Sequence, residues 1–143
     1  MKDSTNENVD MLVLYDGVCG LCNTVVAWLV KHDTSGVLYY APLGGTTSTE
    51  VLDHHPEVPD GLDSIIFVER LDGVERLFWR SRASFRICGH LSAPWCWVAK
   101  LSIFPACLTD VAYRLVARLR YRIWGKLDTC RIPTPSEAER FLP

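Results

Sequence analysis

Two cysteines separated by two residues, Cys19 and Cys22, are the side chains whose type and spacing point most directly to chemistry. They follow an apolar run over residues 11–15 and accompany the start of a helical pattern over residues 20–32. The pair is therefore expected at a helix N-terminus, where unpaired backbone N–H groups and the helix dipole favour negative charge. That setting favours a thiolate, the reactive form of cysteine. Two cysteines this close can also form a disulfide, so the segment predicts dithiol–disulfide chemistry.

The two thiols are expected to have different tasks. Cys19 is expected to lie nearer the helix start and to be the more exposed, so we assign it as the attacking thiolate. Cys22 turns inward and is assigned as the resolving thiol, which attacks the mixed disulfide on Cys19. Asp16 has two interpretations: it accepts or relays the proton of Cys22, or it makes the turn with Gly17 and satisfies backbone donors. The turn is the favoured interpretation.

A Cys-x-x-Cys pair is also half of a zinc site, and this alternative needs two further ligands. Cys88, His90 and Cys96 are candidates, but their spacing fits no common zinc pattern. Cys96, Cys107 and Cys130 are expected to be buried small hydrophobes. No metal or other cofactor is predicted, and the zinc site stays an alternative.

The elements around the pair alternate in a way that indicates an α/β fold. Apolar, β-branched and turn patterns predict four strands and three helices in this first part of the chain. The strands are predicted at residues 11–15, 37–41, 64–69 and 74–79, and the helices at 20–32, around 51–52 and at 81–91, the last with Ser81 as its N-cap. A β-α-β unit, then a β-hairpin with a turn at Asp72-Gly73, then a helix, is the order of the thioredoxin-like fold with a central mixed sheet.

The rest of the chain predicts a helical extension. We expect a disordered leader at residues 1–10, a thioredoxin-like core at 11–91 and a C-terminal helical extension at 92–143, packed on the same domain. Helices are predicted at 95–104 and 110–124, and the tail from Gly125 is expected to be irregular and held by Phe141 and Leu142. The second helix has apolar residues every fourth position, at Val111, Leu115, Leu119 and Ile123, which predicts an inward face.

Charge is unevenly distributed along the chain. Residues 1–63 hold two Lys and ten acidic side chains, whereas residues 100–131 hold seven Lys and Arg against two Asp. Arg114, Arg118 and Arg122 form a stripe beside the predicted inward face, and such a stripe can mark an anionic partner or merely one solvated side of a domain. A small anionic thiol such as glutathione is one candidate. Nucleic-acid binding is not predicted, because the net charge is −2 and the stripe lacks interleaved exposed aromatics.

Composition also bears on location. The polar N-terminus lacks the apolar centre of a secretory signal, and six cysteines without such a signal are expected to be free thiols. The most apolar stretch, residues 93–117, is interrupted by charges and prolines, so contact with a membrane is not expected. The cytoplasm is the predicted compartment.

The motif itself resembles the signature of the DCC family, which is named for Asp-x-x-Cys-x-x-Cys and is described as thiol-disulfide oxidoreductases of thioredoxin-like fold. The matching residues are Asp16-Gly17-Val18-Cys19-Gly20-Leu21-Cys22-Asn23, Asp63-Ser64-Ile65, Ser81-x-Ala83, Asp110-x-x-Tyr113, Arg120-Tyr121-x-x-Trp124-Gly125 and Cys130. The resemblance implies a thioredoxin-like fold, disulfide exchange and functional roles for Asp16, Cys19 and Cys22. Thioredoxins proper place a cis-proline before the third strand, facing the pair. Asp63-Ser64 stands there in this chain, so a different substrate groove is expected.

These observations predict a thiol-disulfide oxidoreductase that exchanges disulfides with a protein or a small-molecule thiol. Two alternatives remain open. One is a non-catalytic binding module of thioredoxin-like fold that docks an anionic partner through Arg114, Arg118 and Arg122. The other is a cysteine-based metal site.

Overall fold

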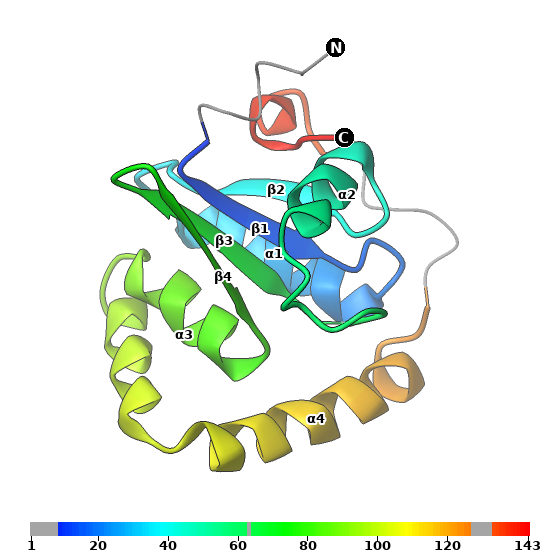
Figure 1. Ribbon diagram of the computed structural model, residues 1–143, viewed down its shortest axis with the longest axis vertical. Coiled ribbons are helices and arrows are strands. Elements are labelled where there is room, and N and C mark those ends of the chain that lie inside the picture. The colour runs from blue at the N-terminus through cyan, green and yellow to red at the C-terminus, as the bar shows by residue number, and fades with distance from the viewer. Residues whose placement is uncertain (1–8, 63, 127–132) are drawn as a thin grey trace.

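A four-stranded mixed sheet forms the centre of the computed structural model, which describes residues 9–62, 64–126 and 133–143 (Figure 1). The strands are β1 (Met11–Tyr15), β2 (Tyr39–Pro42), β3 (Ile66–Leu71) and β4 (Val74–Trp79), in the order β2-β1-β3-β4. β1 runs parallel to β2 and antiparallel to β3, and β3 forms a hairpin with β4. Asp72 and Gly73 both have positive φ in its two-residue turn, as that kind of hairpin requires.

The two faces of the sheet are covered by different helices, because β1 alternates its side chains between two buried clusters. Val13 and Tyr15 point toward α1 (Gly20–His32) and α3 (Ser81–Gly89). Leu12 and Leu14 point toward α2 (Thr46–Asp53) and the loop after it. The result is three layers with the sheet in the middle, and it confirms the expected thioredoxin-like fold with a central mixed sheet.

The C-terminal part adds helices at one edge of this core. The 3₁₀ helix η1 (Trp95–Ile103) packs on α3, and α4 (Ala106–Ile123) then runs along the lower edge of the view toward the start of α1 (Figure 1). A last short helix, η2 (Ala138–Arg140), precedes the chain end. Within the described ranges, no helix is long and apolar enough to cross a membrane.

The predicted inward face of α4 is wrong. Val111, Leu115 and Ile123 are each about 60% exposed (63%, 59% and 61%), and Leu119 is exposed as well. The side of α4 that faces the protein instead carries polar anchors, above all the buried Arg120. Periodicity predicted a helix at 110–124, and α4 begins four residues earlier, at Ala106. Periodicity could not tell which side of this amphipathic helix meets the core.

Ser81 also differs from its predicted role. It is the first residue of α3 rather than its cap, and Arg80, with a positive φ, precedes it. The Ser81 hydroxyl donates to a carboxylate oxygen of Asp110 and lies 3.0 Å from the hydroxyl of Thr109. The side chain therefore links α3 to α4 instead of capping its own helix.

The tail is held against the sheet edge, as predicted. Phe141 stacks on Tyr40 with ring centroids 5.1 Å apart, and the Leu142 N–H donates to the Tyr40 carbonyl at 2.8 Å. The Pro143 carbonyl accepts from the Thr47 N–H at 2.9 Å. At the other end of the chain Val9 is already buried, two residues before the predicted start of the core, while residues 1–8 of the predicted leader lie outside the described residues.

Candidate active site

The cysteine pair lies at the start of α1, as the sequence predicts. Cys19 is the N-cap residue, and its sulfur accepts a hydrogen bond from the Cys22 N–H at 3.4 Å. The Asn23 side-chain amide donates to the carbonyls of Gly17 and Cys19 at 2.8 and 2.9 Å, which fixes the turn that carries the pair. Both thiols are free. The segment therefore places two free thiols close together at a helix N-terminus.

Both thiols are buried, and the expectation that Cys19 is the more exposed is wrong. The exposed fraction is 0% for Cys19 and 4% for Cys22. The chain that follows α4 covers them: Lys126 pairs with Cys19 in an antiparallel β-bridge, and the Gly125 carbonyl accepts from the Gly20 N–H at 3.3 Å. The C-terminal extension thus closes over the pair.

Asp16 joins the turn to α4 through both of its carboxylate oxygens. Oδ1 accepts from the Val18 N–H at 3.1 Å, which is the turn contact expected from the sequence. Oδ2 accepts a short hydrogen bond from the Tyr121 hydroxyl and lies 3.5 Å from Nη2 of Arg120. Asp16 therefore links the turn before α1 to two neighbouring residues of α4, Arg120 and Tyr121.

Arg120 is the residue of α4 that reaches the thiols. It is only 3% exposed, and its Nη1 lies 3.7 Å from the Cys22 sulfur. Nη2 donates to the Tyr121 hydroxyl at 3.2 Å, and the guanidinium lies over the Tyr121 ring, 4.7 Å from its centroid. A buried cation beside a sulfur favours its thiolate.

Sequence reasoning placed neither Arg120 nor Tyr121 at the pair. The signal was present in the run Arg120-Tyr121-x-x-Trp124-Gly125, which belongs to the family resemblance. The basic stripe drew attention to Arg114, Arg118 and Arg122 instead, and these three side chains are exposed on the outer side of α4.

Their surroundings keep the Cys22 thiol and the Tyr121 hydroxyl protonated. Burial, followed by the hydrogen bond and charge of Cys19, raises the pKa of Cys22 to about 12, although the charge of Arg120 acts in the opposite direction. Burial and the hydrogen bond to Asp16 raise the pKa of Tyr121 to about 12. At neutral pH Cys22 is a thiol and Tyr121 is a neutral phenol.

Tyr113 occupies the position near the pair where the sequence departs from thioredoxins. Its hydroxyl accepts a hydrogen bond from the Ile65 N–H at 3.2 Å, at the start of β3. Burial raises the pKa of Tyr113, so its hydroxyl stays protonated. Ser64 beside it is buried, and Asp63 lies outside the described residues. The Tyr113 side chain, from α4, thus accepts the hydrogen bond of the Ile65 N–H at the start of β3.

A cavity of about 570 Å³ lies next to the pair, on the side of Asp16 and Val18. Tyr121, Lys126 and His55 also line it. The His55 ring contacts the carboxylates of Glu57 and Glu75, each at 2.6 Å. Neither cysteine lines this cavity, which therefore borders the site through Asp16, Tyr121 and Lys126 rather than opening onto the thiols.

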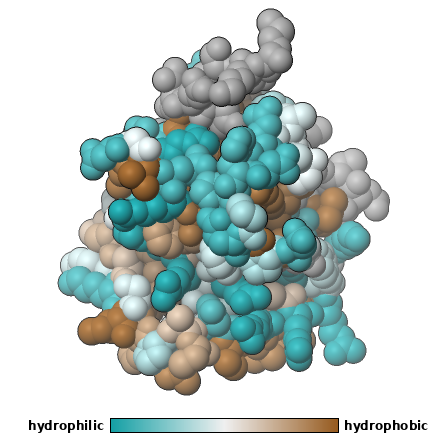
Figure 2. Space-filling model, viewed as in Figure 1, coloured by the Kyte–Doolittle hydropathy of each residue, from teal (hydrophilic) through white to brown (hydrophobic). Residues whose placement is uncertain are grey.

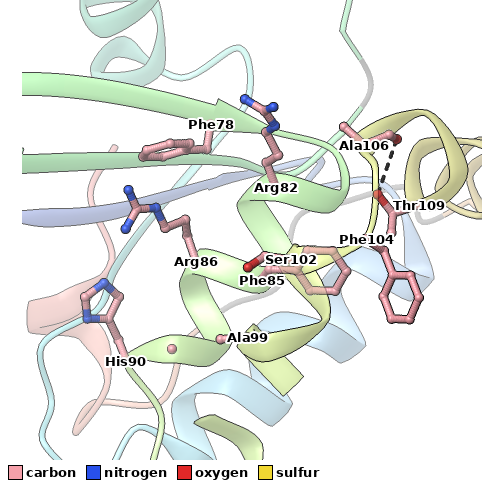
Figure 3. A pocket seen from close by; sticks show the side chains of 11 residues that line it. Phe78, Arg82, Phe85, Arg86, His90, Ala99, Ser102, Phe104, Ala106 and Thr109 are labelled. Atoms are coloured by element: carbon pink, nitrogen blue, oxygen red, sulfur yellow. Dashed lines mark hydrogen bonds between the residues drawn. The ribbon is translucent and has the colours of Figure 1, made fainter. Parts of the chain in front are cut away.

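A second cavity, of about 520 Å³, lies between α3, η1 and the start of α4, and none of its lining residues belongs to the site (Figure 3). Arg82 and Arg86 project from α3 on the side of Phe78, and Phe104 and Thr109 stand at the other end. The guanidinium of Arg86 lies 4.6 Å from the centroid of the Phe78 ring.

The candidate zinc ligands do not join the pair. Cys88 and Cys96 are half-buried on α3 and η1, and His90 lies 3.3 Å from the Glu69 carboxylate. In the part of the chain that the structure describes, no group of three or more His, Cys, Asp or Glu side chains is placed to hold a metal ion. Cys107 is exposed, so its predicted burial is wrong, and Cys130 lies outside the described residues.

Comparison with known proteins bears on the class of this chain. Residues 13–126 match the family model described as DCC1-like thiol-disulfide oxidoreductase. The uncharacterized protein YuxK of Bacillus subtilis (strain 168) is 33% identical over 140 residues, which cover 97% of this chain and 99% of that protein. A DCC family protein of Arabidopsis thaliana, named as chloroplastic, is 29% identical over 122 residues, which cover 85% of this chain and 69% of that protein. No solved structure gives a significant match.

The chain therefore belongs to the DCC1-like thiol-disulfide oxidoreductase family, and the resemblance carried by the motif is confirmed.

Gly20→Ala tests the cover over Cys19. A Cβ at this position would lie 2.5 Å from the Trp124 carbonyl oxygen, so the covering segment must shift. We expect alkylation of Cys19 in the folded protein to become roughly tenfold faster or more, because local opening governs access to a buried group. Peptide mapping after iodoacetamide treatment measures the rate. Gly89→Ala is the matched control, since its Cβ would make only ordinary contact with Ala99; equal labelling of both variants and wild type would show that the segment does not limit access.

The raised pKa of Cys22 predicts an alkaline effect on labelling and on stability. Alkylation needs the thiolate, so labelling of Cys22 in the folded, reduced protein should keep rising about tenfold per pH unit above pH 9, whereas in urea it should level off near the ordinary value of 9.0. Because the folded pKa exceeds the unfolded one, Cys22 stabilises the fold below pH 9, and this contribution is lost as the pH rises toward 12. Superimposable pH profiles for folded and unfolded protein would contradict the shift.

Proposed function

We propose that this protein exchanges disulfides through Cys19 and Cys22, with Cys19 as the attacking thiolate and Cys22 as the resolving thiol. The observation that carries the proposal is the placement of two free thiols close together at the N-terminus of α1, beside the buried guanidinium of Arg120. Membership of the DCC1-like thiol-disulfide oxidoreductase family supports the same chemistry.

The exchange has two steps. The Cys19 thiolate attacks one sulfur of a substrate disulfide, forms a mixed disulfide and expels the other substrate sulfur as a thiolate. Cys22 then loses its proton to solvent or a base and attacks Cys19, which closes the Cys19–Cys22 disulfide and expels the second substrate thiolate. The substrate gains two electrons and takes up two protons, and the pair is oxidised. The reverse sequence oxidises a dithiol.

The raised pKa of Cys22 supports this division of tasks. A thiol held protonated at neutral pH does not compete with Cys19 for the first attack. Once Cys19 is bound in a mixed disulfide, its charge no longer opposes ionisation of Cys22. Arg120, 3.7 Å away, then stabilises the Cys22 thiolate that performs the second step.

We assign Asp16 as a positioning residue rather than a proton relay. Its Oδ1 is used by the Val18 N–H, and its Oδ2 is shared by Tyr121 and Arg120. These contacts hold the guanidinium at the Cys22 sulfur. The contact of Asp16 with the turn agrees with the interpretation favoured by the sequence, and the relay remains the alternative that experiment must exclude.

The substrate is a disulfide or dithiol of a protein or a small molecule. The segment that contains Lys126 covers the pair, so a small or extended substrate needs less opening of this segment than a bulky one. We place the reaction in the cytoplasm, the compartment in which thiols are kept reduced.

Cysteine variants test the division of tasks. We expect Cys19→Ser to abolish dithiol-dependent reduction of a small aromatic disulfide that releases a coloured thiol. Cys22→Ser should stall after one turnover with the substrate attached to Cys19, which intact-mass spectrometry and peptide mapping detect. Cys107→Ser, at an exposed cysteine, is the control and should retain full activity. Full activity in both site variants would end the proposal.

Asp16→Asn separates positioning from proton relay. The amide keeps an oxygen for the Val18 N–H but removes the charge that holds Arg120, so the resolving step should slow by roughly tenfold or less and Arg120→Met should slow it at least as much. Stopped-flow release of substrate thiol from the mixed disulfide measures this step and its pH profile. A relay would instead give a loss of roughly a hundredfold or more in Asp16→Asn with little effect of Arg120→Met.

A further inference from the structure

The outer side of α4 and the last residue of η1 present apolar side chains to solvent. We define the outer apolar face by Ile103, Leu108, Val111, Leu115, Leu119 and Ile123, all of them exposed. Ile103 is 86% exposed and Leu108 is 64% exposed. Figure 2 shows hydrophobic side chains along the lower edge of the molecule, where η1 and α4 lie in Figure 1, with hydrophilic ones among them. Many large apolar side chains exposed on one element are typical of an interaction surface.

The orientation of α4 keeps the outer apolar face exposed. Tyr113 bonds to the Ile65 N–H and Arg120 reaches Cys22 and Asp16, all from the opposite side of the helix. Turning the helix to bury the apolar residues would expose Arg120 and break these contacts. The outer apolar face is therefore a fixed surface feature.

Positive charge accompanies the outer apolar face. Between Trp95 and Lys126 the chain has six Lys and Arg and a single acidic residue, Asp110. Arg114, Arg118 and Arg122 are exposed along one edge of the face, whereas Asp110 accepts a hydrogen bond from Ser81. An apolar helical face bordered by arginines is the pattern of a helix that lies in the plane of a membrane surface, with its apolar side chains among the acyl chains and its cations at anionic headgroups.

We propose that α4 docks this protein on an anionic lipid surface through the outer apolar face and Arg114, Arg118 and Arg122. This inference goes beyond the proposed disulfide exchange and does not depend on it. It also reverses the expectation that the chain makes no membrane contact, which assumed that the apolar side of α4 was buried. The docked form lies on the surface rather than across the bilayer, in keeping with the length and charge of α4.

Charge complementarity favours lipid over a second copy of the chain. A two-fold interface through this face would bring the same patch to both sides, and that patch has no free carboxylate among its described residues to meet the arginines. Lipid phosphate and carboxylate groups supply that partner. The first half of the chain is acidic, and its helix α2 lies toward the opposite end of the molecule from α4, as does the C-terminus (Figure 1). When α4 meets an anionic surface, α2 therefore faces away from it.

Vesicle flotation tests the docking with the full chain. We expect the protein to float with vesicles of phosphatidylcholine mixed with phosphatidylserine, to bind phosphatidylcholine alone far more weakly, and to dissociate as salt rises. Arg118→Glu/Arg122→Glu should lower partitioning onto the anionic vesicles by roughly tenfold or more, since anionic headgroups attract basic residues near the surface and repel acidic ones. Val111→Ser/Leu115→Ser should lower it on both kinds of vesicle.

Matched controls lie on the hairpin. Leu71→Ser and Arg76→Glu change an exposed apolar and an exposed basic residue outside the face, and both should bind vesicles like wild type. Because all the altered side chains are exposed, far-ultraviolet circular dichroism should be unchanged in every variant. The proposal would be overturned by an equal loss of binding in the control and face variants, or by equal binding to vesicles with and without phosphatidylserine. It would also be overturned if light scattering showed a dimer that does not bind vesicles.

Discussion

The buried guanidinium of Arg120 is the constraint on which most of this structure depends. A charge removed from water costs several kcal/mol unless it is paired and hydrogen-bonded, and Asp16, Tyr121 and Cys22 supply those contacts. Arg120 comes from α4, whereas Asp16 precedes α1 and Cys22 lies in its first turn, so these contacts tie the helix to the site. Together with the bond between Tyr113 and the Ile65 N–H, they hold the position of the helix and its rotation about its own axis. The apolar side of α4 faces outward as a consequence, and the redox pair and the exposed face become two sides of one element.

The environment of the cysteines, rather than the motif alone, distinguishes their chemistry. The helix N-terminus and Arg120 favour negative charge at the pair, whereas burial opposes it. For Cys22 burial and the neighbouring Cys19 prevail, so its pKa is raised despite the nearby guanidinium. The balance changes as soon as Cys19 enters a disulfide bond, since one of the opposing charges disappears. These electrostatic effects support the order of the two chemical steps, and they could not be inferred from the spacing of the two cysteines.

The elements of the core could be predicted from the sequence because their signals are local. The strand at Met11–Tyr15 and the helix at Gly20–His32 have the predicted bounds, and the Asp72-Gly73 turn lies where its residue types require. The site was predicted only in part, since Arg120 is distant in sequence from the thiols and its approach depends on tertiary packing. The rotation of α4 could not be predicted for the same reason: hydrophobic periodicity assumes that apolar residues meet the core, and here polar anchors take that side.

The segment over Cys19 has a consequence for the kinetics of exchange. It is held to the site by Gly125 and Lys126, and further along the chain Phe141 and Leu142 hold the tail to the sheet edge. A segment fixed on both sides cannot leave as a fraying terminus does, so reagent reaches Cys19 only during local opening. The observed rate is then the intrinsic rate of thiolate attack multiplied by the open fraction. Its temperature dependence should include the enthalpy of that opening, and any partner that binds the segment would change the rate without touching either sulfur.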